Sequence, residues 1–363
     1  MALQFIDGFD YYTNLYYNWH YNTDGRYIAI ASGVGRSLNS YGPVGSLAVG
    51  GSTTNLWLQR YITTANTTII GFAIKFTYLT YATSFQILQL GNSGVGTGFT
   101  NKLALGWNII TNGLDVYDPS APSATRWAML APLSSITTNN WYYIEWKNTS
   151  GVVDIYVNEK PYWSLISNTK TFYTGSINAI GFGTDISLLN NNYYIDDLYI
   201  MDDVRSGIPP VNYGPIGNSK ITTILPASNG SLHAWTPFSG TNYNQINSVP
   251  DDGGTTYVSA TTVGTSDNYN YTQVTSIPAC VYGIKINTIG RKSPGIVRQI
   301  KPTMLDGTVS SAITTADITL PESYGNQSAI FQARPSDGKT FVGLGPLALA
   351  TINAAKYGFI LTT

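Results

Sequence analysis

The sequence contains very few of the side chains that most often carry out catalysis or bind transition metals. It has one cysteine, Cys280, so no intrachain disulfide can form. Cys280 alternates with apolar residues in "SIPACVYGIKI", which predicts a buried structural thiol rather than a nucleophile. The two histidines are His20 and His233, so the side chains that most often form zinc sites and histidine-based catalytic triads are almost absent.

Charge and long apolar runs are also scarce. Charged residues make up 11% of the chain and the net charge is −1, whereas ordinary soluble proteins have roughly 25% charged residues. We therefore expect no nucleic-acid partner. No apolar run approaches the ~20 residues of a membrane helix, so we expect no membrane association. The opening "MALQFIDGFDYY" shows no secretory signal, which predicts synthesis in a reducing cytoplasm.

Aromatic and turn-forming residues are abundant instead, with 27 Tyr, 8 Trp and 36 Gly. This composition is typical of β-structure with many tight turns. The clearest segment is 141–163, in which "WYYIEWK" and "VVDIYVN" flank the hairpin loop "NTSG". Alternation predicts a core face on each strand and a second face turned away from the core. The core-facing residues are Tyr142, Ile144, Trp146, Val153, Ile155 and Val157; the other face carries Trp141, Tyr143, Glu145, Lys147, Asp154 and Tyr156.

The pattern of segments predicts an all-β protein with two domains. Short alternating runs recur throughout, and only residues 348–356 favour a short helix. Many short strands separated by turns are typical of a β-sandwich or jelly roll. Residues 205–220 hold three Pro and three Gly without alternation, as expected of a linker. We therefore predict a jelly roll over 1–204, a linker over 205–220 and a second β-rich domain over 221–363.

The first half resembles a known family in the order of its segments. "FIDGFDYY", "IIGFAIKF", "WYYIEWK", "VDIYVNEKP" and "YYIDDLYIMDD" follow one another as in a laminin-G/concanavalin-A-like jelly roll, and more narrowly as in tailed-bacteriophage virion proteins. The resemblance covers about residues 5–203. It implies that the opening strand pairs beside the closing one.

The second half resembles a module that follows such jelly rolls in phage structural proteins. "WTPFSGTNYNQINSVPDDGGTTYVSA" and "DNYNYTQV" carry this resemblance. The sequence departs from it at Thr340-Phe341, where a Trp-Thr pair would be expected. The resemblance implies a virion location, synthesis in the host bacterial cytoplasm, and other virion proteins as partners.

The acidic segment "NNYYIDDLYIMDD" is the main candidate for chemistry. Strict alternation would point Asp196 and Asp197 to opposite faces of a strand, where they cannot act on one substrate. No second acid of a glycosidase pair is apparent, which predicts that the protein is not an enzyme. We expect Asp10, Asp196, Asp197, Trp141 and Trp146 to be structural.

Two alternatives remain open for these acidic residues. In the structural reading, Asp196 or Asp197 accepts hydrogen bonds from amides near the chain start, and Asp202 and Asp203 lie in a solvated turn. In the other, Asp-rich loops here or at Asp251-Asp252 bind Ca²⁺. We favour the first, and predict no cofactor.

A cluster of aromatic residues near the start is a candidate contact surface. It consists of Tyr11, Tyr12, Tyr16, Tyr17 and Trp19. Aromatic side chains stack on sugars and also favour protein–protein interfaces. We predict a non-enzymatic virion component of the tail, neck or capsid surface, assembled as a homo-oligomer. The alternative is a carbohydrate-binding adsorption module that recognises host glycans.

Overall fold

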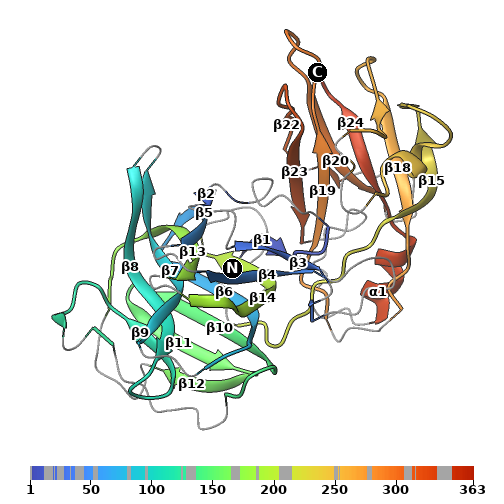
Figure 1. Cartoon of the computed structure of the whole chain (residues 1–363). Coiled ribbons are helices and arrows are strands. Elements are labelled where there is room, and N and C mark those ends of the chain that lie inside the picture. The colour runs from blue at the N-terminus through green and yellow to red at the C-terminus, as the bar shows by residue number, and fades with distance from the viewer. Residues whose placement is uncertain are drawn as a thin grey trace. The chain divides into compact units, whose positions relative to one another are not determined.

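A computed structural model of the chain gives two compact units, of which the first, unit 1, ends at Ile221 and the second, unit 2, runs from Thr222 to Thr363. Figure 1 shows the strands of unit 1 from blue to green and those of unit 2 from yellow to red. The structure describes residues 2–11, 19, 21–22, 28–32, 34–36, 45–51, 56–79, 83–94, 97–123, 126–127, 136–164, 172–184, 188–203, 215–248, 252, 254–275, 280–305, 313–314, 316–332 and 346–363.

Unit 1 contains two antiparallel sheets. The eight-stranded sheet has the order β12-β11-β10-β6-β14-β4-β3, and β1 also pairs with β14. Its strands are β1 (Ala2–Asp7), β3 (Ile28–Ser32), β4 (Gly45–Gly51), β6 (Thr67–Phe76), β10 (Trp141–Thr149), β11 (Val152–Val157), β12 (Lys160–Ser164) and β14 (Leu188–Asp202). The six-stranded sheet has the order β2-β5-β13-β7-β8-β9. Its strands are β2 (Tyr21–Asn22), β5 (Leu56–Ala65), β7 (Phe85–Gly94), β8 (Thr97–Asn108), β9 (Gly113–Tyr117) and β13 (Ile177–Thr184).

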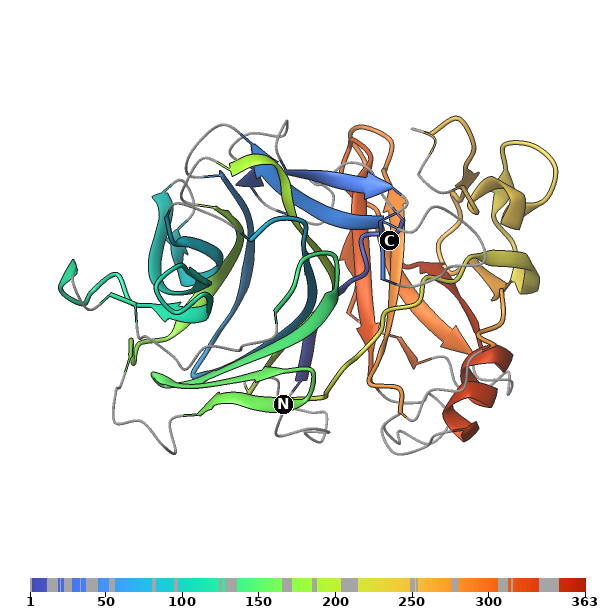
Figure 2. The ribbon, with the colours of Figure 1, turned by 60° about the horizontal axis from the view of Figure 1, so that its bottom comes forward.

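One hydrophobic core joins these two sheets into a sandwich (Figure 2). Both sheets contribute large, fully buried side chains, among them Trp146 and Phe72 from one and Trp107 and Phe85 from the other. The predicted all-β, jelly-roll-like sandwich is confirmed. β1 pairs with β14, so the opening strand does lie beside the closing one.

The predicted hairpin between β10 and β11 is present. Thr149 pairs with Val152, and the two residues between them, Ser150 and Gly151, both have positive φ, at 46° and 87°. This geometry matches the twist of the flanking strands. A side chain at Gly151 would also meet the carbonyl oxygen of Phe172 at 2.7 Å, so the turn requires glycine there for two reasons.

Unit 2 is built around its own six-stranded sheet, in the order β15-β18-β24-β20-β21 with β22 also paired to β20. These strands are β15 (Pro226–His233), β18 (Ser266–Tyr271), β20 (Gln299–Leu305), β21 (Ile313–Thr314), β22 (Ile318–Thr319) and β24 (Lys356–Leu361). Two small ribbons accompany it: β16 (Thr236–Pro237) with β17 (Val258–Ser259), and β19 (Ile284–Gly290) with β23 (Gly325–Phe331). A separate small core contains Met304, Tyr357 and Phe331.

Helices are few in the described part of the chain. They are the 3₁₀-helix η4 (Asn242–Gln245) and α1 (Pro346–Ala354), which confirms the predicted short helix with a shift of two residues. No helix among the described residues combines the length and apolar character needed to cross a membrane.

Candidate functional site

A β-bulge in β14 shapes the acidic segment. Asp196 pairs with Ala73 of β6, but the next pair is Tyr199 with Gly71, so β14 carries one extra residue. Asp197 lies within the bulge with φ of 50°, and its N–H donates to the Asp196 carboxylate at 2.7 Å. A bulge of this kind shifts the alternation of the strand by one residue. The core-facing side chains are therefore Tyr193, Ile195, Leu198 and Ile200.

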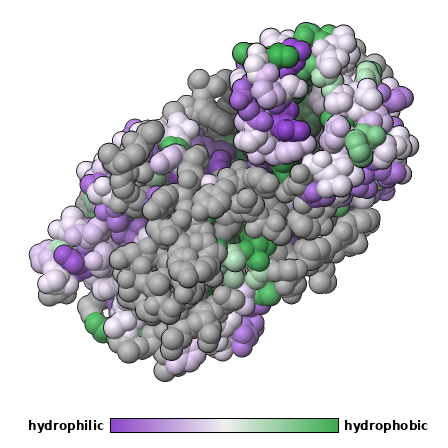
Figure 3. All heavy atoms as spheres, turned by 45° about the horizontal axis from the view of Figure 1, so that its top comes forward, coloured by the Kyte–Doolittle hydropathy of each residue, from purple (hydrophilic) through white to green (hydrophobic). Residues whose placement is uncertain are grey.

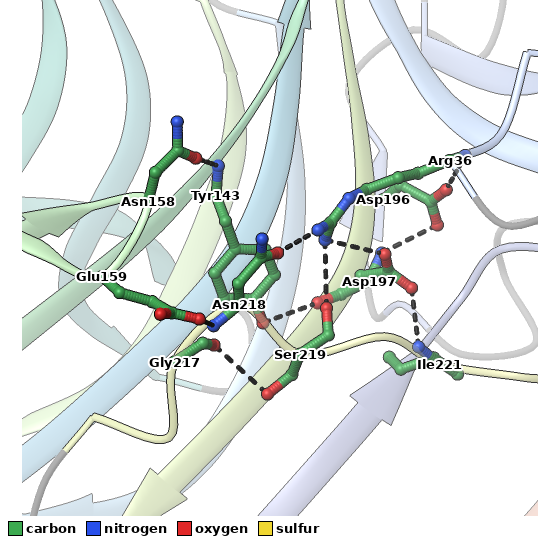
Figure 4. Close-up of polar contacts among 10 residues, drawn as sticks. All are labelled: Arg36, Tyr143, Asn158, Glu159, Asp196, Asp197, Gly217, Asn218, Ser219 and Ile221. Carbon is green, nitrogen blue, oxygen red and sulfur yellow. Dashed lines mark hydrogen bonds and ion pairs between the residues drawn. The ribbon is translucent and has the colours of Figure 1, made fainter. Parts of the chain in front are cut away.

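Both aspartates contact the same residue, Arg36. The Asp196 carboxylate accepts the Arg36 backbone N–H at 2.6 Å, and the Asp197 carboxylate accepts Arg36 Nη1 at 3.1 Å (Figure 4). The guanidinium also lies over the ring of Tyr143, 5.1 Å from its centroid. The prediction that strand alternation keeps the two carboxylates apart is therefore wrong, because the bulge removes the alternation at that point.

Residues 215–221, which we call the strap, lie against these side chains. Three of their backbone N–H groups donate to carboxylates: Gly217 to Glu145 at 2.8 Å, Asn218 to Glu159 at 3.0 Å and Ile221 to Asp197 at 2.7 Å. The carbonyl of Ser219 accepts Arg36 Nη1 at 3.0 Å, and the Asn218 side-chain oxygen accepts Arg36 Nη2 (Figure 4). We call Arg36, Glu145, Glu159, Asp196 and Asp197 the clasp.

The strap covers a face of β10 that would otherwise be solvated. Tyr143 and Glu145 are each only 2% exposed, although the alternation of side chains along β10 places them on the face opposite the core. The Tyr199 hydroxyl donates to Glu145 at 2.5 Å, and the Tyr199 ring lies directly over Gly71. Residues 215–220, predicted as part of a linker, thus belong to unit 1, and residues 205–214 lie outside the described residues.

Burial and crowding of carboxylates control the charge of the clasp. Burial, reinforced by the charge of Asp197, raises the pKa of Asp196 to about 9. Burial also raises the pKa of Asp197 to about 6, against the opposing effects of the Ile221 N–H and Arg36. The Glu145 pKa is raised by burial as well, with the bonds from Tyr199 and Gly217 opposing it. Burial and the charge of Asp197 therefore favour the neutral form of Asp196, while the Ile221 N–H and Arg36 favour the ionised form of Asp197.

This arrangement supports attachment of the strap rather than chemistry on a substrate. Asp196 and Asp197 are 2% and 1% exposed, and the oxygen atoms of both accept hydrogen bonds from the chain itself. In the described part of the chain, no three His, Cys, Asp or Glu side chains are grouped so as to hold a metal ion. The positive partner of Asp197 is the Arg36 guanidinium.

Two details of the structural reading of the acidic segment differ from the prediction. The amides that bind Asp196 and Asp197 belong to Arg36, Asp197 itself and Ile221, not to the chain start as predicted. The prediction of a solvated turn is wrong for Asp202, which is fully buried at the end of β14, while Asp203 is exposed.

A turn at Asp252 agrees with the preferred reading of the second Asp-rich loop. The Asp252 carboxylate accepts the N–H groups of Gly254, Thr255 and Thr256, at 3.1, 3.1 and 3.0 Å. These bonds lower the pKa of Asp252, together with the one from the Thr256 hydroxyl, which is the largest cause. Asp251 lies outside the described residues.

The remaining candidate residues are spread over unit 1. Asp10 is buried, and its charge contributes to the raised pKa of Asp196. Trp146 lies in the core and Trp141 is half-buried, with Lys75 5.1 Å from its ring centroid. Trp19 is 2% exposed and stacks on Phe9, so it belongs to the core and not to an exposed contact surface. Tyr11 is half-buried against the core. Tyr12, Tyr16 and Tyr17 lie outside the described residues.

Sequence reasoning missed Arg36, Glu145 and Glu159 as site residues. No pattern around Arg36 or Glu159 in the sequence indicates a site. The one available signal was the unusual position of Glu145 within the aromatic strand "WYYIEWK".

Known proteins resemble this chain in structure but not in sequence. No protein-family profile and no curated protein matches the sequence. Among solved structures, the cellulose induced protein Cip1 matches with a TM-score of 0.37 and 14% identity, covering 55% of this chain and 95% of that one. Domain 4 of AbnA, a GH43 extracellular arabinanase from Geobacillus stearothermophilus, in complex with arabinotriose, gives 0.35 and 16%, covering 55% and 94%. The globular domain of T. cruzi calreticulin gives 0.38 and 8%, covering 56% and 89%. At these values the likeness carries no argument about activity.

Proposed function

We propose that this protein is a non-enzymatic structural component of a multi-copy assembly, in keeping with the virion role that the sequence resemblance implies. The chemistry of the clasp supports a non-enzymatic role, because its carboxylates bind the strap of the same chain. The surface of unit 2 supports a role in assembly.

The observation that carries this proposal is an exposed aliphatic tip on unit 2. Val263, Ile296 and Val297 are 55%, 44% and 67% exposed. Residues next to them in the chain are bonded to the last residues of the protein: the Gly264 N–H donates to the Leu361 carbonyl at 2.8 Å, and the Gln299 N–H donates to the Thr363 carbonyl at 3.2 Å. Figure 3 shows apolar residues at an end of unit 2 among polar ones. We call these three residues the β24 tip.

A second copy of the chain is the partner we propose for the β24 tip. Clustered exposed aliphatic side chains mark interaction sites. A net charge of −1 means that copies repel each other little, which permits self-association. A stable interface needs about 800 Å² from each partner, so the tip would form the apolar centre of a larger contact.

Sedimentation velocity of the full chain over a range of concentrations tests this proposal. We expect a homo-oligomer that V263D/V297D converts to monomer. The matched control is Ile110→Asp, because Ile110 is an aliphatic residue 71% exposed in unit 1. A wild-type chain that stays monomeric at ~100 µM, well above the micromolar range of functional contacts, would refute the proposal.

A second candidate, carbohydrate binding, is favoured by an exposed aromatic pair on unit 2. Phe238 and Tyr257 are 61% and 38% exposed, and their ring centroids lie 5.2 Å apart. The Phe238 N–H donates to the Tyr257 carbonyl at 2.9 Å, which holds the two residues in register. Aromatic faces presented in this way can stack on the apolar face of a sugar ring.

A further inference from the structure

We propose that Trp141, Lys75 and Tyr194, which we call the Lys75 row, form a binding site for an acidic sugar. The carboxylate of the sugar pairs with the Lys75 ammonium, and its ring stacks on a flanking aromatic side chain. The Lys75 row belongs to unit 1, whereas the β24 tip and the Phe238–Tyr257 pair belong to unit 2. This inference therefore rests on neither of the roles proposed above.

Strand register places the three side chains next to one another on three neighbouring strands. Trp141 of β10 and Tyr194 of β14 both pair with Lys75 of β6. The neighbours of Lys75 in β6, Ile74 and Phe76, lie in the core, so alternation directs Lys75 to the opposite face of the sheet. The Lys75 Nζ lies 5.1 Å from the ring centroid of Trp141 and 5.1 Å from that of Tyr194. The ammonium is thus flanked by two aromatic rings.

The Lys75 ammonium forms no ion pair with any residue that the structure describes. The ion pairs in that part of the chain join Arg36, Lys292 and Lys301 to carboxylates. Lys75 is half-buried, and burial lowers the pKa of its ammonium because water is removed from the charged form. A charge that has lost part of its hydration is stabilised when an ion of opposite sign pairs with it. The Lys75 row therefore favours an anionic ligand.

The neighbouring side chains on the same face do not supply this anion. The next such residue of β6 is Ala73, which pairs with Tyr143 of β10 and with Asp196 of β14. Asp196 is 2% exposed, and its two carboxylate oxygens accept backbone N–H groups within the clasp. The raised pKa of Tyr143, caused first by burial, keeps its hydroxyl uncharged. The pairing anion is therefore supplied by a ligand.

The aromatic neighbours select the kind of anion. Trp141 and Tyr194 are half-buried, so each ring keeps part of its surface in solvent. Such a surface favours the apolar face of a sugar ring, which a phosphate or sulfate ion lacks. Asn139 and Asn140, which are exposed just before Trp141, add amide groups able to bond to sugar hydroxyls. An acidic sugar matches both the ammonium and the rings.

Titration calorimetry of the full chain with tetragalacturonate and with its methyl ester tests this site, because the two ligands differ in charge but share the same sugar. We expect the methyl ester to bind at least about tenfold more weakly, since it lacks the charge-assisted bond. Lys75→Met should weaken the binding of tetragalacturonate to a similar extent, whereas Lys75→Arg retains it. The matched control is Lys102→Met, because Lys102 is also half-buried and its Nζ lies 5.4 Å from the Tyr173 ring centroid. K102M should bind as the wild type does.

The same titration distinguishes the Lys75 row from the aromatic pair of unit 2. Binding of tetragalacturonate should persist in the F238A/Y257A chain, and its loss there would assign the ligand to unit 2 and overturn the proposal. The proposal is also overturned if the wild type binds no tetragalacturonate at about 10 mM, weaker than any affinity of practical use. Equal affinities for the acid and its methyl ester, or for the wild type and K75M, would overturn it as well. None of these outcomes changes the oligomeric state, which tests the β24 tip separately.

Discussion

Replacement of Gly71 by alanine tests the packing that supports the clasp. Gly71 is a residue of β6 paired with Tyr199 on one side and Glu145 on the other. A Cβ at this position would lie 2.0 Å from Cε1 and 2.5 Å from Cζ of the Tyr199 ring. The ring has no room to yield in place, since Tyr199 is 3% exposed and its hydroxyl is bonded to Glu145. G71A must therefore displace Tyr199.

The expected loss of stability combines two effects. Overpacking in a well-packed region costs about 1–3 kcal/mol. Displacement of the ring also weakens the Tyr199–Glu145 bond, and a hydrogen bond to a charged group contributes about 1.5–3 kcal/mol. Replacing glycine by alanine also restricts the unfolded chain, which stabilises the fold by about 0.4–1 kcal/mol and leaves a net loss of about 1.5–5.5 kcal/mol. For a unit of this size, the melting temperature falls by roughly 3–22 °C.

Urea unfolding followed by tryptophan fluorescence measures this loss, because Trp235 is the only tryptophan of unit 2 and the other seven lie in unit 1. The matched control is Gly181→Ala, whose Cβ would meet Trp57 at 3.6 Å, an ordinary contact. In a Tyr199→Ala background, G71A should cost almost nothing. If G71A and G181A have equal stabilities, or if the effects of G71A and Tyr199→Ala simply add, the steric argument fails.

Two further predictions concern unit 2. Asp267→Ala should destabilise it by about 2–5 kcal/mol, because this 1%-exposed carboxylate accepts Asn242 Nδ2 at 2.8 Å and the Tyr269 hydroxyl. Its removal takes the partner from the Tyr269 hydroxyl and from one N–H of Asn242 Nδ2, whose other bond goes to the Trp235 carbonyl. Hydrogen exchange over β18 and β24 measures the loss, and Asp317→Ala, which removes a half-exposed ion pair, should change it by no more than about 1 kcal/mol. If unit 2 binds sugars, F238A and Y257A should each abolish the glycan-array signal while Tyr61→Ala retains it; a signal that survives both changes argues against the aromatic pair.

Local patterns were enough to predict the architecture of the chain. Alternation in "WYYIEWK" and "VVDIYVN" correctly identified Ile144, Trp146, Val153, Ile155 and Val157 as core residues, because side chains of a regular strand alternate between faces whatever the partner. Turn chemistry likewise indicated the hairpin at Ser150-Gly151. These features depend only on neighbouring residues, so one sequence contains all the information they need.

The site depended on contacts that no local pattern contains. Asp196 and Asp197 both contact Arg36, one at its backbone N–H and the other at its guanidinium, because β14 bulges against β6, and a bulge is a property of the pairing between two strands. Arg36 lies 160 residues before Asp196, and the strap lies 72 residues beyond Glu145. The sequence by itself therefore determined which residues prefer strands, turns and the core. Only the tertiary structure decided which buried charges share a site, because that depends on register and distance between segments far apart in the chain.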